Sequence, residues 1–197
     1  MVARPPPKHK KHYVEITTQF HADGSLTFLN LTIYGHSAEQ MSTLIQSYVR
    51  RRGSNLTLQQ QQGLGQFKEL EKLQTQLVES NELILKYFNA FNDIFFFGCL
   101  KSLCKVQFYP QEAMRPGLRG QCTYPQNGTC LIRIKSGSRK GPPKTRLTGY
   151  LSTLVHEMLH AVFHTYVCRC GHVCKNRYAE SVGGHGIAWQ WAALAIQ

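Results

Sequence analysis

The amino-acid sequence predicts an α+β fold, in which strands and helices occupy separate stretches of the chain. Two patterns support this class. Short stretches with alternating apolar residues and many β-branched side chains are typical of strands. Longer stretches with apolar residues three and four positions apart are typical of amphipathic helices. The 197 residues are enough for one domain with a well-formed core and a smaller extension.

The first residues predict a tail, a hairpin and a helix. Residues 1–12 are basic and contain three consecutive prolines, which favours a disordered tail. Residues 13–34 alternate apolar and polar side chains on both sides of Ala22-Asp23-Gly24, which predicts a β-hairpin. Residues 38–51 predict a helix with Ser37 as its N-cap.

The stretch over residues 53–65 is rich in glutamine and is interpreted as a linker. This interpretation divides the chain into three parts. The tail is followed by an N-terminal extension over residues 13–65, which holds the hairpin, the helix and the linker. The main domain then covers residues 66–197.

The main domain opens with a helical pattern over residues 67–97, which Glu79-Ser80-Asn81 can divide into two helices. Strands are expected over residues 104–109, 120–124 and 130–134, the last two as a hairpin. Apolar residues then recur at helical spacing from about Arg146 to Tyr166, and a last helix is expected from Gly184 to the end. We therefore expect a long helix packed beside a small antiparallel sheet.

The formal net charge of +12 is unevenly distributed along the chain. The stretch between Ala113 and Val155 holds no acidic residue and eight basic ones. These are Arg115, Arg119, Arg133, Lys135, Arg139, Lys140, Lys144 and Arg146. Such clustering suits a polyanionic partner, with nucleic acid as the first candidate. The alternative is an ordinary solvated surface on a basic protein.

The seven cysteines are an odd number, and no apolar segment follows the basic N-terminus as it would in a secretory signal. Reduced thiols in an intracellular protein are therefore expected, rather than a disulfide framework. No apolar run approaches the roughly 20 residues that span a bilayer, so we expect no membrane partner. The basic tail could serve as a nuclear import signal, which favours a nuclear location.

The segment His156-Glu157-Met158-Leu159-His160 lies in the predicted helix over residues 146–166. Histidines four positions apart project from one face of a helix, one turn apart, and can bind one zinc ion. Glu157 lies beside the first ligand, where it can act on a zinc-bound water as a general base. The pattern indicates a zinc metallopeptidase with a zincin-like fold, with Glu157 as the catalytic residue.

A catalytic zinc usually has three protein ligands, and three residues are candidates for the third. His185 opens the last helix within Gly183-Gly184-His185-Gly186, where glycines permit close approach of the backbone. Glu180 has a separation from His156 that suits a glutamate ligand, but the following glycines disfavour a continuous helix. His164 lies one turn beyond His160 and is too far along the helix. The metzincin pattern does not apply, because Tyr166 occupies its third histidine position. On local chemistry, His185 is the preferred ligand.

The sequence resembles the SprT-like zinc metalloprotease family. The residues that carry the resemblance are His156-Glu157-Met158-Leu159-His160-Ala161 with the later Gly184-His185-Gly186, and the stretches 88–96, 130–134 and 153–155. The resemblance covers roughly residues 80–197. It implies His185 as the third zinc ligand, protein substrates and a role in cleaving DNA–protein crosslinks.

The chain departs from the family between His160 and His185, where it is longer and rich in cysteine. Four soft ligands fall within seven residues there, namely Cys168, Cys170, His172 and Cys174. They could hold a second, structural zinc. The spacing is tighter than in ordinary zinc fingers, so a loop with free thiols is the alternative.

Three functions are compatible with these features. The first is a zinc metalloprotease that acts on DNA-bound or DNA-crosslinked proteins. Its candidate DNA contacts are Arg133, Lys135, Arg139, Lys140, Lys144 and Arg146. The second is a general intracellular zinc peptidase without DNA dependence, and the third is a non-catalytic, zinc-stabilised DNA-binding module. Glu157 disfavours the third, because a scaffold needs only metal ligands. The sequence carries no indication of the oligomeric state.

Overall fold

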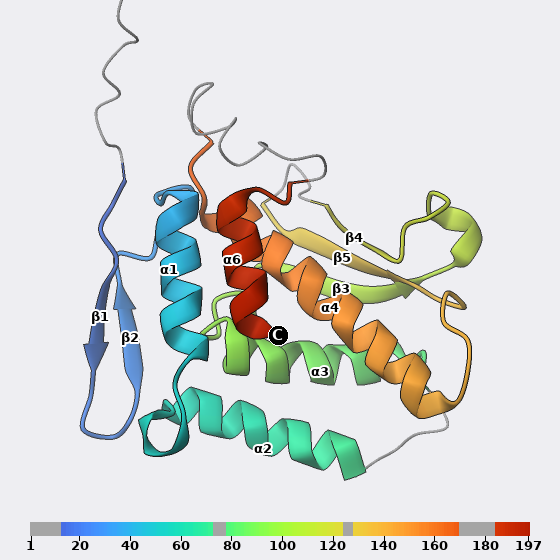
Figure 1. Cartoon of the computed structure of the whole chain (residues 1–197), viewed down its shortest axis with the longest axis horizontal. Coiled ribbons are helices and arrows are strands. Elements are labelled where there is room, and N and C mark those ends of the chain that lie inside the picture. The colour runs from blue at the N-terminus through green and yellow to red at the C-terminus, as the bar shows by residue number, and fades with distance from the viewer. Residues whose placement is uncertain (1–12, 73–77, 124–127, 170–183) are drawn as a thin grey trace, which may run out of the picture.

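The computed structural model describes residues 13–72, 78–123, 128–169 and 184–197, and it has the predicted α+β class (Figure 1). Its elements, in chain order, are β1 (Thr17–Phe20), β2 (Leu26–Leu29), α1 (Ala38–Val49), α2 (Leu58–Lys72), α3 (Asn81–Phe95), β3 (Cys104–Tyr109), β4 (Gly120–Thr123), β5 (Cys130–Lys135), α4 (Pro143–Tyr166) and α6 (Ile187–Ile196). Short 3₁₀ helices lie at Gly53–Asn55 and Gln111–Ala113.

The predicted N-terminal hairpin and helix are both confirmed. Strands β1 and β2 pair antiparallel with Phe20 opposite Leu26, and Gly24 in the turn has the left-handed φ of 81° that glycine tolerates. Ser37 caps α1 through a reciprocal pair of hydrogen bonds with Gln40, so both groups satisfy backbone N–H donors that the helix leaves unpaired.

The predicted linker over residues 53–65 is wrong, because most of it is helical. Helix α2 begins at Leu58, and Thr57 and Gln60 form a second capping pair at its start. The Gln60 side chain is buried and donates to the carbonyls of Tyr48 and Ile94. These tertiary hydrogen bonds attach α2 to both α1 and α3.

The predicted break in the helical stretch over residues 67–97 is confirmed at Ser80. Its side chain accepts a hydrogen bond from the backbone N–H of Leu83 and caps α3. Tyr87, Phe88 and Phe91 on α3 are buried, as expected for a helix with a broad apolar face. Helix α3 therefore contributes aromatic side chains to the core.

The three-stranded sheet is mixed, so the expectation of an antiparallel sheet is wrong in part. Its strand order is β3-β5-β4. Strands β4 and β5 form the predicted antiparallel hairpin, with Cys122 opposite Ile132. Strand β3 instead pairs parallel to β5, with Cys104 opposite Cys130. Strand β4 is therefore an edge strand, with one side available to other groups.

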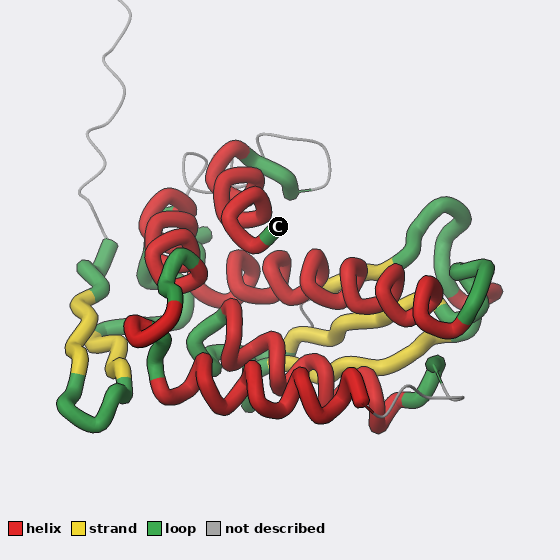
Figure 2. The backbone as a smooth tube through the Cα atoms, turned by 60° about the horizontal axis from the view of Figure 1, so that its bottom comes forward, coloured by secondary structure: helices red, strands yellow, loops and turns green. Residues whose placement is uncertain are grey.

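Helix α4 is the longest helix and lies at the centre of the molecule. It packs on β4 and β5 and also contacts α1, α3 and α6 (Figures 1 and 2). It begins at Pro143, three residues before its predicted start, because proline suits the first helical position. Helix α6 begins at Ile187, after the predicted start at Gly184, and lies beside α1.

The N-terminal part is attached directly to the C-terminal end of α4. The backbone N–H of Tyr34 donates to the Thr165 carbonyl, and that of Cys168 donates to the His36 carbonyl. Buried side chains from α1, α3, α4 and α6 belong to one core. The division of the chain at residue 65 stays a prediction, but residues on both sides of it share this core. Among the described helices, none combines the length and apolar character needed to cross a membrane.

Candidate metal centre

Three histidines converge at the C-terminal half of α4. His156 and His160 lie on adjacent turns of this helix, and His185 comes from the segment directly before α6. The Nε2 atom of His185 lies 3.0 Å from His160 Nε2 and 3.2 Å from His156 Nε2. One nitrogen of each ring lies within 4.8 Å of the other two, so the cluster could hold a metal ion. The preferred ligand set from the sequence is therefore brought together.

The spacing of these nitrogens suits zinc. Two imidazole nitrogens bound to one tetrahedral zinc stand roughly 3.3 Å apart, given zinc–nitrogen bonds of about 2.0–2.1 Å. The measured separations of 3.0 and 3.2 Å are close to this value. Three nitrogen donors with no carboxylate among them are also the donor set of one type of catalytic zinc site.

Burial favours the neutral form of His156 and His160, which is the form that binds metals. Desolvation lowers the pKa of His156, and the neighbouring His185 lowers it further. Desolvation, with smaller contributions from the nearby histidines, lowers the pKa of His160 to about 3. An uncharged imidazole at neutral pH offers a free lone pair, which is the state a metal ligand requires.

Trp189 contacts all three imidazoles, a role that the sequence did not indicate. Its ring stacks on His160 with centroids 5.0 Å apart and 24° between the planes. It also meets His156 and His185 edge to face, at 4.9 and 4.4 Å. Trp189 follows His185 by four residues, which is close to the spacing of one helical turn. This spacing was the signal available in the sequence.

Glu157 lies against the edge strand β4. It is only 7% exposed, and it is not among the residues whose ligand atoms converge. Its carboxylate accepts a hydrogen bond from the backbone N–H of Cys122 on the edge strand β4, which lowers its pKa. Burial is the larger influence and raises the pKa of Glu157 to about 7. A carboxyl with this pKa can accept and release a proton near neutral pH.

The other candidate ligands stand apart from the cluster. His164 is not part of the converging group, as expected, and its Nδ1 accepts a hydrogen bond from Arg169. Tyr166 donates through its hydroxyl to the Cys99 carbonyl and has a structural role. Glu180 lies outside the described residues.

The proposed second zinc site falls mostly on residues that the structure does not describe. Cys170, His172 and Cys174 lie outside the described ranges. Cys168 is described and is buried. The second zinc site therefore remains a prediction from the sequence.

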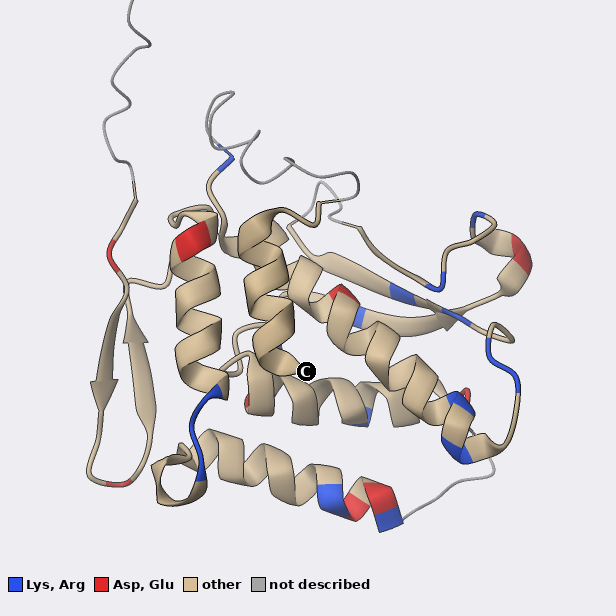
Figure 3. Cartoon of the chain, viewed as in Figure 1, with Lys and Arg blue, Asp and Glu red and all other residues tan. Residues whose placement is uncertain are grey.

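The six candidate DNA contacts occupy different environments (Figure 3). Lys140 and Lys144 are exposed near the start of α4. Lys135 is buried, and Arg133 stacks over the Tyr109 ring at 4.8 Å. Arg139 donates to the Gly149 carbonyl and the Thr153 hydroxyl, so its guanidinium fastens the preceding loop to α4. The sixth, Arg146, is half-buried.

A large cleft opens beside the histidine cluster. It has a volume of about 1110 Å³, and its walls come from α2, α3, α4 and α6. His156, His185 and Trp189 line it together with many apolar side chains. Two of the three candidate ligands therefore face a space large enough to receive part of another molecule.

Comparison of the chain with models of known protein families, with curated proteins and with solved structures found no match.

Proposed function

We propose that this chain is a zinc-dependent metallopeptidase of the zincin-like, SprT-like type. One observation carries the proposal. His156 and His160 lie on the helix that also bears Glu157, and His185 converges on them from the segment before α6. Three imidazoles would hold the ion. When bound, zinc lowers the pKa of a water molecule and polarises a peptide carbonyl.

The remaining chemistry belongs to Glu157. Its carboxylate would take a proton from the attacking water and later deliver that proton to the leaving amine. The hydrogen bond from Cys122 and the packing of Gly120 fix the side chain on one side. A base held in one orientation loses little entropy when the reaction begins.

DNA-bound or DNA-crosslinked proteins are the substrates we propose. The acid-free stretch over residues 113–155 supplies exposed cations at Arg115, Arg119, Lys140 and Lys144, and contacts between these and phosphates would place a bound protein near the cleft. The motifs that resemble SprT-like domains support the same substrate class. On this proposal, duplex DNA stimulates cleavage of a DNA-binding protein.

A general peptidase without DNA dependence is the second candidate. One observation favours it: Arg139 and Lys135, two of the six candidate DNA contacts, are used within the fold. Cleavage rates that are equal with and without DNA would select this candidate over the first.

The proposal is tested by the Glu157→Gln substitution. Glutamine has the shape of glutamate but cannot accept the proton, so cleavage should fall by at least about 100-fold. Zinc content, measured by mass spectrometry of the purified protein, should stay unchanged because Glu157 is not a ligand. Equal, negligible proteolysis by the wild type and the variant, with and without DNA, would instead indicate a zinc-stabilised binding module.

A further inference from the structure

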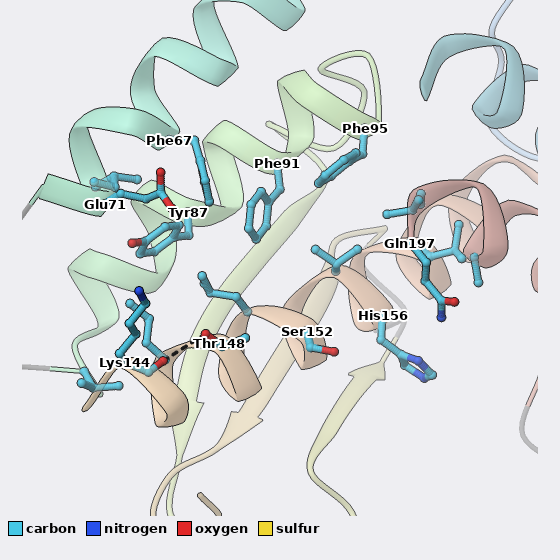
Figure 4. Close-up of a pocket in the computed structure, with 18 of the residues that line it drawn as sticks. Phe67, Glu71, Tyr87, Phe91, Phe95, Lys144, Thr148, Ser152, His156 and Gln197 are labelled. Carbon is cyan, nitrogen blue, oxygen red and sulfur yellow. Dashed lines mark hydrogen bonds between the residues drawn. The ribbon is translucent and has the colours of Figure 1, made fainter. Parts of the chain in front are cut away.

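The cleft beside the metal centre extends far beyond the histidines. One wall is α4, whose lining residues run from Pro143 to Leu159. Because a helix rises about 1.5 Å per residue, this wall is roughly 24 Å long. Figure 4 shows Lys144 and Glu71 at one end and His156 at the other. A molecule that fills the cleft therefore reaches the candidate metal centre with one end.

The α4 wall of the cleft keeps an exposed row of side chains within the described part of the chain. Lys144, Thr148 and Ser152, at intervals of four, are exposed although α4 lies at the centre of the molecule. Leu151 beside them is half-exposed. Across the cleft stand aromatic side chains of α2 and α3, including Phe67 and Phe91 (Figure 4). The cleft is thus mainly apolar, with a polar row along one wall.

The secondary structure of the walls restricts what the cleft can bind. The described lining residues lie on α2, α3, α4 and α6 or beside their ends, and none belongs to a strand. Backbone groups in these helices are bonded within each helix. An extended peptide in the cleft would find no strand edge to pair with, and its own buried N–H and C=O groups would stay unsatisfied at a cost of about 1–3 kcal/mol each. A helical segment satisfies its own backbone.

The dimensions also suit a helix. A volume of about 1110 Å³ over roughly 24 Å gives a mean cross-section of roughly 46 Å². A whole helix with side chains is about 10–12 Å across, so the cleft takes one apolar face and leaves the other in solvent. Four turns, or about 14–16 residues, match the length.

From these features we propose that the cleft binds an amphipathic helix of the substrate protein and holds the adjoining segment at the metal centre. This inference rests on the proposed peptidase function and adds a substrate class to it. The helix contributes an apolar stripe at positions i, i+3 or i+4, and i+7, which packs between α4 and the aromatic side chains of α2 and α3. Residues that follow the helix are delivered to His156 and His185, which line both the cleft and the ligand cluster.

Binding is tested apart from catalysis, on the full chain carrying Glu157→Gln. The probe is a fluorescent amphipathic peptide of about 14 residues with leucines on one face. A matched peptide has a central proline, which breaks the helix but keeps the composition. Fluorescence anisotropy should show the helical peptide binding at least about tenfold more tightly than the proline peptide. Equal binding of the two peptides would overturn the helical occupant.

A substitution that fills the cleft tests whether the peptide binds there. Thr148→Trp adds bulk at an exposed residue that lines it, without removing any buried group. Thr43→Trp on α1 is the matched control, because Thr43 is also exposed on a helix and does not line the cleft. Thr148→Trp should weaken peptide binding at least about tenfold, and Thr43→Trp less than about twofold. Unchanged binding to the Thr148→Trp protein would overturn the assignment to this cleft.

Cleavage then separates this inference from the proposed function. With Glu157 intact, a substrate that joins the helix to an unstructured segment should have a lower KM than the segment alone. Thr148→Trp should remove this KM advantage, because the residue lines the part of the cleft that holds the helix. Cleavage of both substrates with equal KM would overturn the inference alone, whereas binding without any cleavage would overturn only the peptidase function.

Discussion

Gly120 lies directly against Glu157. A methyl group at Gly120 would stand 2.9 Å from Glu157 Oε1 and 2.5 Å from Thr153 Cγ2, both closer than real contacts allow. Both neighbouring side chains are buried on α4, so neither can move into solvent. The edge strand β4 therefore reaches α4 at a residue that must have no side chain.

The Gly120→Ala substitution tests this contact. Overpacking should lower the free energy of unfolding by about 1–3 kcal/mol. Displacement of Glu157 should lower the peptidase rate by at least about tenfold at unchanged zinc content. The control is Gly65→Ala in α2, where nothing lies within 4 Å of the new methyl group, and where alanine should add up to about 1 kcal/mol of stability. A Gly120→Ala protein with wild-type stability and activity would contradict the contact.

Metal affinity should depend on Trp189 as well as on the three histidines. His185→Ala should remove the bound zinc, because it deletes a ligand. Trp189→Ala should weaken zinc binding by about 10–100-fold, the usual effect of losing a group that orients ligands. Trp189→Phe keeps an aromatic ring against His160 and should bind nearly as well. Isothermal titration with zinc measures all three, and wild-type affinity in Trp189→Ala would refute the orienting role.

The number of zinc ions per chain tests the cysteine-rich loop separately. If it holds a structural ion, the wild type contains two zinc ions and Cys170→Ser contains one. A single zinc in both proteins would leave the histidine cluster as the metal site and assign free thiols to the loop.

DNA binding should depend on the exposed lysines near the start of α4. Each phosphate contact contributes about 0.9 to the slope of log K against log salt concentration. Replacing Lys140 and Lys144 together by alanine should therefore reduce that slope by up to about 1.8 on duplex DNA. The matched control is Lys68→Ala with Lys101→Ala, two exposed lysines outside the basic stretch. Equal slopes for the two double variants would argue against a DNA surface at this end of α4.

Acid should destabilise the protein through His36. This side chain is fully buried, its Nδ1–H donates to the Val14 carbonyl, and its Nε2 accepts from the Thr32 N–H. Desolvation lowers its pKa below the usual 6.5, so the unfolded chain binds the proton more tightly. Stability is then complete above about pH 6.5 and falls below it, by at most about 1.4 kcal/mol per pH unit.

The measurement compares urea unfolding of the wild type and His36→Gln between about pH 7.5 and 5.5. Glutamine can donate and accept hydrogen bonds but does not titrate, so the variant should show a shallower dependence on pH. Buried histidines elsewhere contribute equally to both proteins. Identical pH dependence would show that His36 does not cause the acid sensitivity.

Local signals predicted the parts of the fold that local chemistry determines. The apolar stripe of α4, the turn at Gly24, the cap Ser37 and the break at Ser80 all depend on a few neighbouring residues, and each is observed. The histidine cluster was predictable in a similar way. Helical spacing indicated His156 and His160, local chemistry favoured His185, and the resemblance to SprT-like domains supported that choice.

Features that depend on tertiary contacts were missed. The glutamine-rich stretch is helical because Gln60 bonds to neighbouring elements and Gly63 allows close packing on α3. The Thr57–Gln60 capping pair was the local signal available. The parallel pairing of β3 with β5 was not predictable, because alternation along a strand does not indicate its direction. The contact of Trp189 with all three histidines was not predictable either, because it joins α6 to α4.

His160 and His185 lie 25 positions apart in the chain. A preformed site that draws ligands from two such distant segments exists only in the folded chain, so an ion held by both would stabilise the folded state and not the unfolded one. At a free ion concentration 100 times its dissociation constant, this stabilisation is about 2.7 kcal/mol. The atoms that would bind the ion would then also keep α6 attached to α4, and loss of the metal would loosen the fold.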